Sequence, residues 1–261
     1  AREWSPQYPK NQDSFVVLPL ADGFYDLNLE DLAQESYDAQ RTDQRIAAVL
    51  DDVGWPSALR DLDTGIATVQ ATDFAQPNDG GEQPALNHLQ DVAESEVGAL
   101  FMSADGKVVF QNRVAMSGAS AEATFTNADM SELHVAHNDN YLWNVIRIAR
   151  EDGIQIEYDA SSGAPRKVLT RDVMPMGNDA EALNVAEWLA GVFGNQRLRV
   201  ESLKLKPLAV GVDDVFGLEL RDMIQVQHTP PGGDSLNQAC AVEQITHTFR
   251  KGDWTTVLSV T

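Results

Sequence analysis

The stretch ALNHLQDVAESEVGALFMSADGKVVFQNR, residues 85–113, predicts a helix that runs directly into a β-hairpin. In its first half, four apolar residues recur at helical spacing and form one stripe: Leu86, Leu89, Ala93 and Val97. Gly98 follows, and a glycine just after the last periodic residue is a typical helix end.

The second half of this stretch predicts two strands joined by a tight turn. Phe101 lies in the first strand, and Val108 and Phe110 alternate along the second. Between them, Asp105-Gly106 is the dipeptide most typical of a two-residue hairpin turn. Because an isolated hairpin is only marginally stable in water, we expect the helix and hairpin to dock against another part of the protein.

The composition is that of a globular protein with an unusual charge. At 261 residues, the length predicts one or two domains on a prior of about 150 residues each. The chain is 43% hydrophobic and 23% charged, which is enough to bury a core. Its net charge of −21 argues against a surface that binds nucleic-acid phosphates, because such surfaces need clustered Lys and Arg. The charge suits a protein that must stay soluble, or one that repels nucleic acid passing nearby.

Cys240 is the only cysteine, so no internal disulfide and no cluster of thiolate metal ligands is predicted. Its flanks, QACAVEQ, predict a strand in which a lone cysteine acts as a small hydrophobic residue. No run approaches about 18 apolar residues, so no membrane span is predicted. No signal peptide is visible after Ala1, and we expect a processed or truncated chain.

The region before the opening stretch predicts one strand and one helix. Residues 1–10 predict an extended loop, and FVVLPLADGF at 15–24 predicts a short strand that ends at Asp22-Gly23. A lone strand needs a sheet, so we expect the chain to begin partway through a β domain. Residues 42–53 predict an amphipathic helix with Thr42 as its N-cap.

Ile46, Leu50 and Val53 share one face of that helix, and Gly54 ends it. Extended segments are then predicted at 58–75, and an exposed loop, QPNDGGEQP, at 76–84.

The second half of the chain predicts strands around a third helix. Strands are predicted from His134 onward, including 141–150 and, after the turn at Asp152-Gly153, 154–158. Asn178 and Glu181 form a capping-box pattern at the start of a helix that ends at Gly194. Its predicted buried stripe consists of Leu183, Ala186, Leu189 and Phe193.

The last part of the chain predicts strands only. RLRVESLKLKP at 197–207 alternates, but its apolar phase slips between Val200 and Leu203, which indicates a bulge. Further strands are predicted at 220–229, 240–249 and 254–260, with turns at 230–234 and 251–253 between them. Short strands at this spacing are typical of a sandwich or barrel.

No set of residues predicts a catalytic, cofactor or metal site. His134 and His137, with Asp139 nearby, do not match a zinc-binding spacing, and a solvated turn is the favoured interpretation. His228 and His247 lie in predicted strands, where a structural histidine is the default.

A calcium loop is only faintly suggested by Asp61, Asp63 and Gly65, because the glycine comes one position early and the closing Glu is missing. The chain has no G-x-S-x-G motif, and Cys240 has no activating neighbour. Gly232-Gly233 lies in a Pro-flanked turn and not in a phosphate-binding loop. The residues therefore favour a structural or binding protein.

Segments spread along the chain carry a resemblance to a known family. In order, they are DGFYDL at 22–27, RIAAVLDDVGWP at 45–56, the opening stretch up to LFMSADGKVVFQNR, NVIRIARE at 144–151, DASSGAPR at 159–166, AEALNVAEWLAGVFGNQRLRVESLKLKP at 180–207, LELRDMIQVQHTPPGG at 218–233 and VEQITHTFRKGDWTTVLSV at 242–260. Together they cover most of the chain, and the sequence resembles the minor tail proteins that form the tail-tip hub of siphophages infecting actinobacteria. It departs from the family near Gly163 to Pro165, where an aromatic-Gly pair is frequent, and at Arg221-Asp222, where Gly-Asp is usual.

The resemblance implies an α+β, mainly β fold: a tail-tube-like β-barrel or sandwich with one flanking helix, plus a small α/β domain. It implies the end of a preceding β-barrel domain at 1–35, the small α/β domain at 36–115 and the tail-tube-like barrel at 116–261. The helix at 178–193 would pack outside that barrel. The strand at 15–21 would belong to the other barrel, whose beginning is missing here or lies in another chain.

The resemblance also implies a function without enzymatic activity or cofactors. The expected protein is a structural component of the virion at the distal end of the phage tail. It would form a homotrimer, join the six-fold tube to the three-fold tip, and open for the tape measure and DNA. Expected partners are further copies of itself, the distal tail protein, the tape-measure protein and tail-fibre or receptor-binding proteins. DNA would pass through the lumen without specific binding.

Two alternatives remain open from the sequence. A receptor- or carbohydrate-binding module would need a solvent-facing aromatic platform, whereas the five Trp residues are scattered along the chain. A cell-wall hydrolase would be recognised by cleavage of glycan or peptide by the purified protein.

Overall fold

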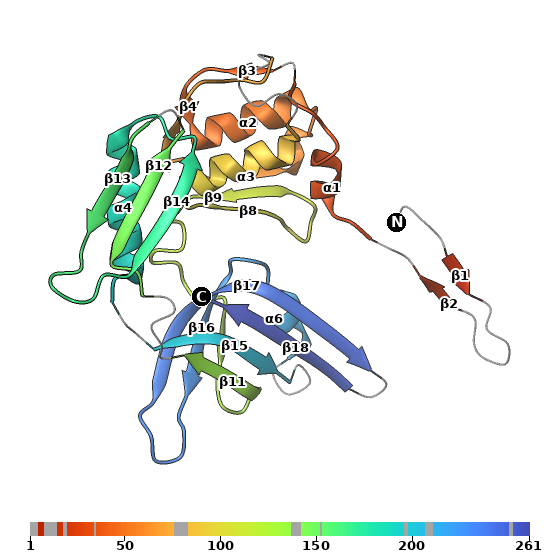
Figure 1. Cartoon of the computed structure of the whole chain (residues 1–261). Coiled ribbons are helices and arrows are strands. Elements are labelled where there is room, and N and C mark those ends of the chain that lie inside the picture. The colour runs from red at the N-terminus through yellow and green to blue at the C-terminus, as the bar shows by residue number, and fades with distance from the viewer. Residues whose placement is uncertain are drawn as a thin grey trace.

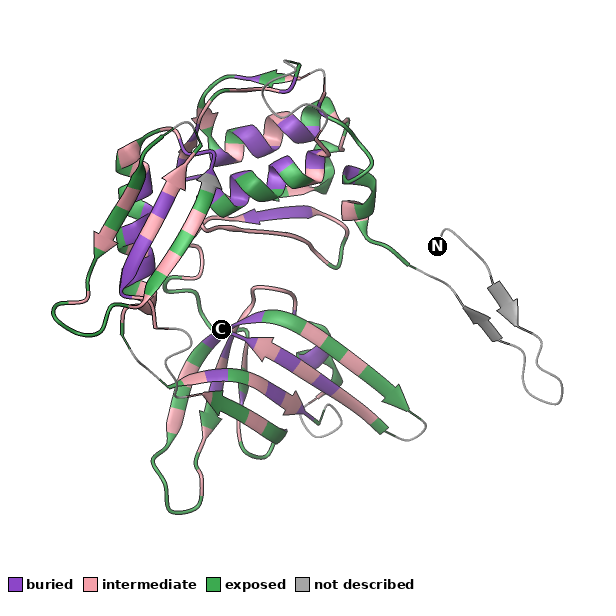
Figure 2. Cartoon of the chain, in the orientation of Figure 1, coloured by how far each residue is buried: buried purple, intermediate pink, exposed green. Residues whose placement is uncertain are grey.

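The computed structural model describes residues 5–7, 15–17, 20–33, 35–75, 83–136, 142–151, 153–195, 198–206, 211–250 and 253–261. Figure 1 shows two groups of elements, with the helices α2, α3 and α4 in the upper group and a curled sheet in the lower one. The buried residues form three hydrophobic cores (Figure 2). The predicted fold class, α+β and mainly β, is confirmed.

The first core lies between two helices and a small sheet. Helices α2 (Thr42–Asp52) and α3 (Ala85–Ser95) pack together over the sheet β5-β9-β8. That sheet consists of β5 (Arg60–Leu62), β8 (Ala99–Met102) and β9 (Val108–Gln111). The predicted helix and hairpin are therefore present, and they dock against α2 as expected.

Several short elements surround these two helices and the sheet, and others precede them in the chain. They are α1 (Gly23–Leu27), β3 (Ser36–Tyr37) paired with β7 (Thr72–Asp73), β4 (Gln40–Arg41) paired with β6 (Thr68–Val69), and the 3-10 turn η1 (Ser57–Leu59). Strand β1 (Ser5–Gln7) lies within the predicted loop at 1–10 and pairs with β2 (Phe15–Val17). The strand expected over 15–24 is shorter, because Asp22 caps α1 through a 3.1 Å bond from the Phe24 N–H. Residues 76–82 of the predicted exposed loop lie outside the described residues.

The buried face of α3 differs from the predicted stripe at its end. The helix stops at Ser95, and Val97 has a left-handed φ of 56°, so Val97 packs against a different core. The buried positions of α3 are Ala85, His88, Leu89, Val92, Ala93 and Ser95. At Gly98, a Cβ would lie 2.7 Å from the Gln111 carbonyl oxygen, so the close approach of the backbones requires a glycine.

The β8–β9 turn is longer than the two residues predicted. Met102 pairs with Val108, and Gly106 takes a left-handed φ of 81° within the connection. This matches a hairpin loop in which a glycine follows a type I turn. The Ser103 N–H donates to the Lys107 carbonyl at 3.0 Å and closes the loop.

Helix α2 begins one residue earlier than a Thr42 N-cap would allow. The N-cap is Arg41, whose N–H donates to Gln44 Oε1 at 3.3 Å, and Thr42 is a buried residue of the first turn. The predicted role of Thr42 is therefore wrong, because its hydroxyl is used inside the core. Ile46 and Leu50 are fully buried, as the predicted face required.

The second core belongs to residues 142–195. Strands β12 (Val145–Arg150), β13 (Gln155–Asp159) and β14 (Val168–Met174) form a sheet in the order β13-β12-β14, covered by α4 (Asp179–Phe193). The helix expected beside the barrel therefore packs on this sheet. Asn178 caps it by accepting from the Glu181 N–H at 3.0 Å, as predicted.

The stripe predicted on α4 is wrong at one position. Leu183 is 37% exposed, and the fully buried residues are Ala182, Val185, Ala186, Leu189 and Ala190. The smaller alanines face the sheet, which lets the helix approach it closely. Glu181 does not complete a capping box, because its Oε1 accepts from the Thr68 N–H at 3.0 Å and thereby links α4 to β6.

The third core is enclosed by a six-stranded sheet. Its strands are β10 (Ala123–Phe125), β11 (Met130–Ala136), β15 (Arg199–Leu205), β16 (Met223–His228), β17 (Leu236–Arg250) and β18 (Asp253–Val260), in the order β10-β16-β17-β18-β15-β11. The sheet curls into a half-barrel, with the helix α6 (Val212–Phe216) beside it (Figure 1). The prediction of strands only for the last part of the chain is wrong at this helix. Residues 142–195 are inserted between the paired strands β11 and β15.

Two local features of the half-barrel follow from its sequence. His134 pairs with Ser202 and Val135 pairs with Val200, so Glu201 is the extra residue of the predicted bulge. At the turn between β10 and β11, Asn127 bonds both the N–H and the carbonyl of Thr229, at 3.0 and 2.9 Å. These two bonds fix the β10–β11 turn against the end of β16.

Arg221 adopts a backbone conformation that favours glycine, with φ of 71°. Its guanidinium forms an ion pair with Glu243 at 2.6 Å. We expect Arg221→Gly to be about 1 kcal/mol more stable than Arg221→Ala, because both lose the ion pair and only glycine relieves the strain. Urea unfolding of the two variants measures this difference. Equal midpoints would show that the left-handed backbone costs nothing at this position.

Candidate functional site

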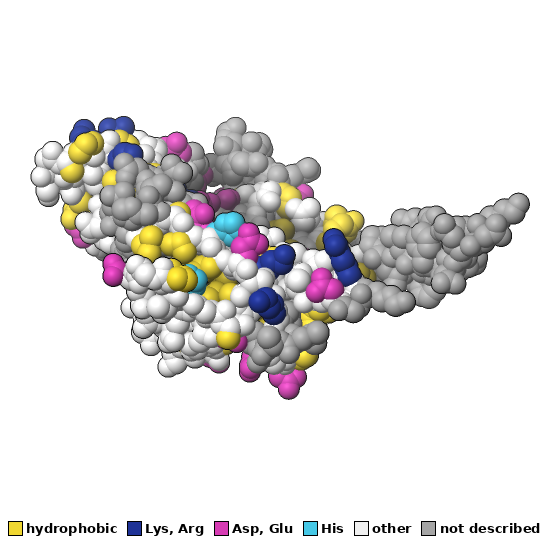
Figure 3. Space-filling model, turned by 90° about the horizontal axis from the view of Figure 1, so that it is seen from below, with side chains coloured by type: hydrophobic (Ala, Val, Ile, Leu, Met, Phe, Trp, Pro, Cys, Tyr) yellow, Lys and Arg dark blue, Asp and Glu magenta, His cyan; other side chains and the backbone are white. Residues whose placement is uncertain are grey.

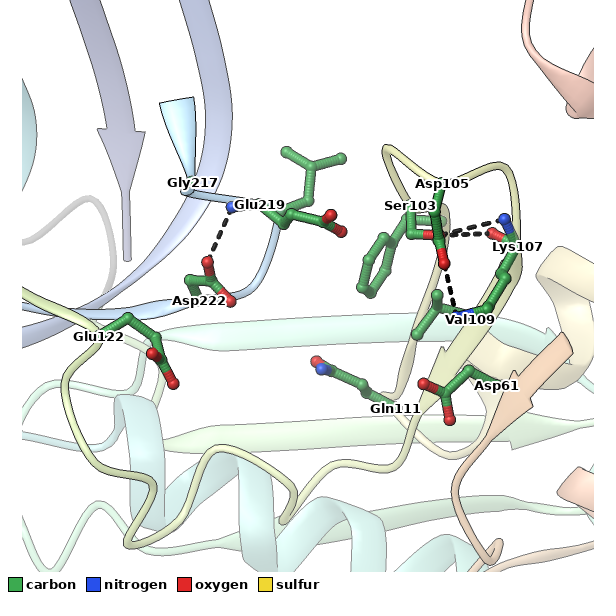
Figure 4. A pocket seen from close by; sticks show the side chains of 12 residues that line it. Asp61, Ser103, Asp105, Lys107, Val109, Gln111, Glu122, Gly217, Glu219 and Asp222 are labelled. Atoms are coloured by element: carbon green, nitrogen blue, oxygen red, sulfur yellow. Dashed lines mark hydrogen bonds and ion pairs between the residues drawn. The ribbon is translucent and has the colours of Figure 1, made fainter. Parts of the chain in front are cut away.

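A cleft of about 420 Å³ lies between the β8–β9 hairpin and the half-barrel (Figure 4). One wall comes from β5, β8, β9 and the hairpin loop, and the other from residues 217–222 together with Glu122. Five carboxylate side chains line it: Asp61, Asp105, Glu122, Glu219 and Asp222. The cleft is therefore an acidic hollow between the two parts of the molecule.

Lys107 is the basic side chain among the residues that line the cleft, and it forms an ion pair with Asp105. The Lys107 Nζ lies 2.5 Å from Asp105 Oδ2, and Asp105 also accepts from the Ser103 hydroxyl at 2.5 Å. These contacts lower the pKa of the Asp105 carboxyl and raise the pKa of the Lys107 amine. Glu219, on the opposite wall, contributes a smaller part to the shift of the Lys107 pKa.

The chemistry of the cleft is electrostatic. On the half-barrel wall of the cleft, the Asp222 carboxylate accepts a hydrogen bond from the Glu219 N–H at 2.8 Å (Figure 4). Within the described ranges, no group of three His, Cys, Asp or Glu side chains is arranged to hold a metal ion. Five carboxylates against one paired lysine repel phosphate and other anions.

The histidines weighed in the sequence lie apart from this cleft. His134 is exposed on β11, with Nε2 3.0 Å from Glu132 Oε1, while His137 and Asp139 lie outside the described residues. His228 ends β16. His247 lies on β17, where Nδ1 is 2.8 Å from the Thr256 hydroxyl.

The three residues that faintly suggested a calcium loop, Asp61, Asp63 and Gly65, make separate contacts in the structure. Asp61 lines the acidic cleft, whereas Asp63 accepts from the Asn112 N–H at 3.3 Å. Gly65 packs so closely on α2 that a Cβ would lie 2.0 Å from the Thr42 hydroxyl. These contacts explain the glycine as a packing requirement.

Cys240 is fully buried in the half-barrel, as a small hydrophobic residue would be. Burial raises the pKa of its thiol to about 11. A protonated, buried thiol is a poor nucleophile.

Sequence reasoning missed a buried cation in the first core. Arg45 is fully buried, and its Nη2 donates to the carbonyl oxygens of Asp38 and Gln70 at 2.9 and 2.8 Å. Its Nη1 lies 3.2 Å from His88 Nε2, and the guanidinium lies 5.0 Å from the centre of the Tyr37 ring. A guanidinium only donates, so Nε2 of His88 must accept and the imidazole must be neutral. In the sequence, the position of Arg45 next to Ile46, on the apolar face of α2, was the one signal that could have indicated its burial.

Glu96 is the second buried charge that the sequence did not indicate. It follows α3 and accepts from the Thr42 hydroxyl, from the Ile66 N–H at 3.0 Å and from the Ala67 N–H at 3.2 Å. The carboxylate also lies at the N-terminus of α2, where negative charge is favoured. Glu96 therefore joins α2, α3 and the segment before β6.

Figure 3 shows the molecule from below the view of Figure 1. There, Lys and Arg side chains form separate spots among acidic and hydrophobic ones in the coloured part. Among the described residues, every helix is too short or too polar to cross a membrane.

Comparisons with known proteins identify the fold. No family model and no curated protein matches the sequence. Among solved structures, a 43 kDa tail protein of prophage MuSo2 from Shewanella oneidensis superposes with a TM-score of 0.64 at 14% identity, over 99% of this chain and 76% of that one. A tail protein from Neisseria meningitidis gives 0.66 at 11% identity, over 99% and 77%.

A chain in the virion of a native gene transfer agent particle is also similar, with a TM-score of 0.55 at 15% identity. The match covers 85% of this chain and 47% of that one. At such low identities the likeness concerns the fold. Over nearly its whole length, this chain has the fold of phage and prophage tail proteins.

Proposed function

We propose that this protein is the tail-tip hub of a siphophage: a structural component that closes the distal end of the tail tube. The observation that carries the proposal is the fold likeness to prophage tail proteins over 99% of the chain. The ordered sequence segments that resemble tail-tip hub proteins point in the same direction. In this role the protein acts as a structural part of the tail and not as an enzyme.

In this proposal three copies form a ring that adapts the six-fold tube to the three-fold tip. Residues 36–115 serve as the small α/β domain, and residues 116–261 serve as the barrel domain, with 142–195 as an insertion. Within residues 1–35, the strands β1 and β2 belong to the end of a preceding barrel, whereas α1 packs into the core of the small domain. The partners are the distal tail protein, the tape-measure protein and tail-fibre or receptor-binding proteins.

The charge of the chain fits passage of DNA through such a ring. A net charge of −21 gives an assembly of several copies a strongly negative surface, which raises the electrostatic cost of contact with DNA phosphates. We place part of this charge on the wall of the lumen, so that the tape measure and the DNA pass without binding.

The mass of the purified full chain tests the proposal. Sedimentation or mass photometry over a range of concentrations is expected to show a trimer. A structure of that trimer is expected to show an acidic axial face. A protein that stays monomeric at all concentrations contradicts the hub, and a neutral or basic axial face contradicts the proposed lumen.

A further inference from the structure

The hairpin formed by β17 and β18 carries a group of aromatic rings that is open to solvent. Phe249 and Trp254 are directly opposite each other in the antiparallel pair, and their ring centres are 5.3 Å apart. Phe216, from the end of α6, stacks on Trp254 at 4.5 Å. Phe249 is 61% exposed and Phe216 is 52% exposed. Two neighbouring phenylalanines this exposed are unusual and typically mark an interaction site.

The same hairpin offers an unpaired backbone edge. Strand β16 pairs with β17 only from Leu236 to Ala241, and Val242 bonds to Asp222 and Arg221. Beyond that point, among the described strands, residues 243–250 pair with β18 alone. Figure 1 shows β17 and β18 running on together to their common hairpin end, and Figure 2 shows that end as largely exposed. An edge of this kind is a template for an added strand.

The sequence of this edge lacks the usual protection. From Gln244 to Phe249 it reads QITHTF, with no Lys, Arg, Asp, Glu, Pro or Gly. Natural proteins normally block an exposed edge with charges, prolines or bulges. The register shift at Glu243 and the two charged residues Glu243 and Arg250 lie at the ends of the edge and flank this uncharged stretch. The β-branched and aromatic residues between favour a paired strand.

The charge of the chain indicates which partner fits this surface. Two copies that each carry a charge of −21 repel each other over most of their surface. They associate most favourably where the surface carries no Asp or Glu, and the segment 244–249, with the exposed rings of Phe249 and Phe216 beside it, is such a surface. A basic partner would gain more from the acidic surfaces elsewhere, such as the cleft.

We propose that residues 243–250 of β17, with the rings of Phe216 and Phe249, form the surface on which a second copy of this chain adds a strand. Main-chain hydrogen bonds along the edge give the alignment, and apolar side chains of the second copy cover the two rings. Each copy contributes this surface once, and a different surface of its neighbour completes the contact. Such head-to-tail contacts form a ring when the rotation between copies closes, as the proposed trimer requires. The inference rests on the proposed function, because it assumes an assembly of copies.

The test combines association with amide hydrogen exchange of the full chain in a dilution series. We expect the amides of 243–250 to exchange more slowly as the protein assembles. Phe249→Glu is expected to weaken association of the copies at least about tenfold, since docking would bury the new carboxylate beside the aromatic side chains. Phe249→Thr keeps the β-strand propensity of the position and removes the ring. We expect this variant to weaken association of the copies as well. Ile154→Glu is the matched control, because Ile154 is 64% exposed and lies in another unit.

Four outcomes decide the matter. Protection of 243–250 together with weakened association of both Phe249 variants, and not of the Ile154 variant, supports the proposal. Assembly of the wild type without protection, with the Phe249 variants associating normally, overturns it and leaves the hub intact. A wild type that never assembles overturns the hub as well. Protection that arises only when a cell-wall glycan or another tail protein is added shows that the occupant is not a second copy.

Discussion

His88→Gln is expected to remove a large part of the acid sensitivity of the α2–α3 unit. His88 is 3% exposed and accepts from Arg45, and burial, together with that neighbouring cation, lowers its pKa from 6.5 to about 3. The unfolded chain binds a proton near pH 6.5, whereas the folded chain does not until about pH 3. The stability linked to His88 is therefore complete above pH 6.5 and is lost as the pH falls towards 3.

The magnitude follows from the two pKa values. Between pH 7.5 and pH 4.5 the wild type should lose about 2.7 kcal/mol through His88 alone, at about 1.36 kcal/mol per pH unit below 6.5. Glutamine keeps an oxygen acceptor for Arg45 and does not titrate in this range. The stability difference between wild type and variant should therefore shift by about that amount over this pH interval.

Urea unfolding at the two pH values, followed by amide exchange in α2 and α3, measures this shift. Carboxylates whose pKa is lowered in the folded state, such as Asp43 and Asp159, also lose stability in acid. They are present in both proteins, so their effect cancels in the comparison. His134→Gln makes the same substitution on the exposed strand β11 and is the control. A pH-independent difference between wild type and His88→Gln would contradict the buried Arg45–His88 contact.

Glu96→Ala is expected to destabilise the same unit by about 3–5 kcal/mol. The substitution leaves three donors without their acceptor: the Thr42 hydroxyl and the N–H groups of Ile66 and Ala67. Each buried donor left without a partner costs about 1–3 kcal/mol. The variant also removes the negative charge from the N-terminus of α2, which adds a smaller loss.

Equilibrium unfolding of Glu96→Ala beside Glu94→Ala measures this effect. Glu94 lies two residues earlier on α3, is exposed and forms a surface ion pair with Arg171, so its loss should cost less than about 1 kcal/mol. Glu96→Gln keeps the shape and part of the acceptor capacity and should fall between the two. A Glu96→Ala variant as stable as Glu94→Ala would show that water replaces the carboxylate without cost.

Local patterns in the sequence predicted the local structure well. The helix and hairpin of residues 85–113, the cap at Asn178 and the bulge near Val200 all depend on neighbours within a few positions. The errors concern the cap at Thr42, the length of the β8–β9 turn and the side of an element that is buried. Leu183 satisfied the helical spacing, but the sheet under α4 contacts the neighbouring alanines instead. Spacing alone leaves this rotation undetermined, because it depends on the surface against which the helix packs.

The buried charges could not be predicted for a similar reason. Arg45 is stable in the core because its acceptors arrive from Asp38, Gln70 and His88. Such partners are far apart in the sequence, and no periodic pattern links them. The same holds for the aromatic group of the hairpin, where Phe216 reaches Trp254 from another element.

By itself the sequence determined the three longer helices, most of the strands, the cap at Asn178, the acidic character of the chain and the resemblance to tail proteins. Each of these depends on residue type and short-range spacing, which the chain carries in any conformation. Only the tertiary structure decided the order of strands in the half-barrel, the insertion of 142–195 and the position of the acidic cleft. It also decided that the hairpin of 85–113 forms one wall of that cleft, since long-range pairing and burial arise only when distant segments meet.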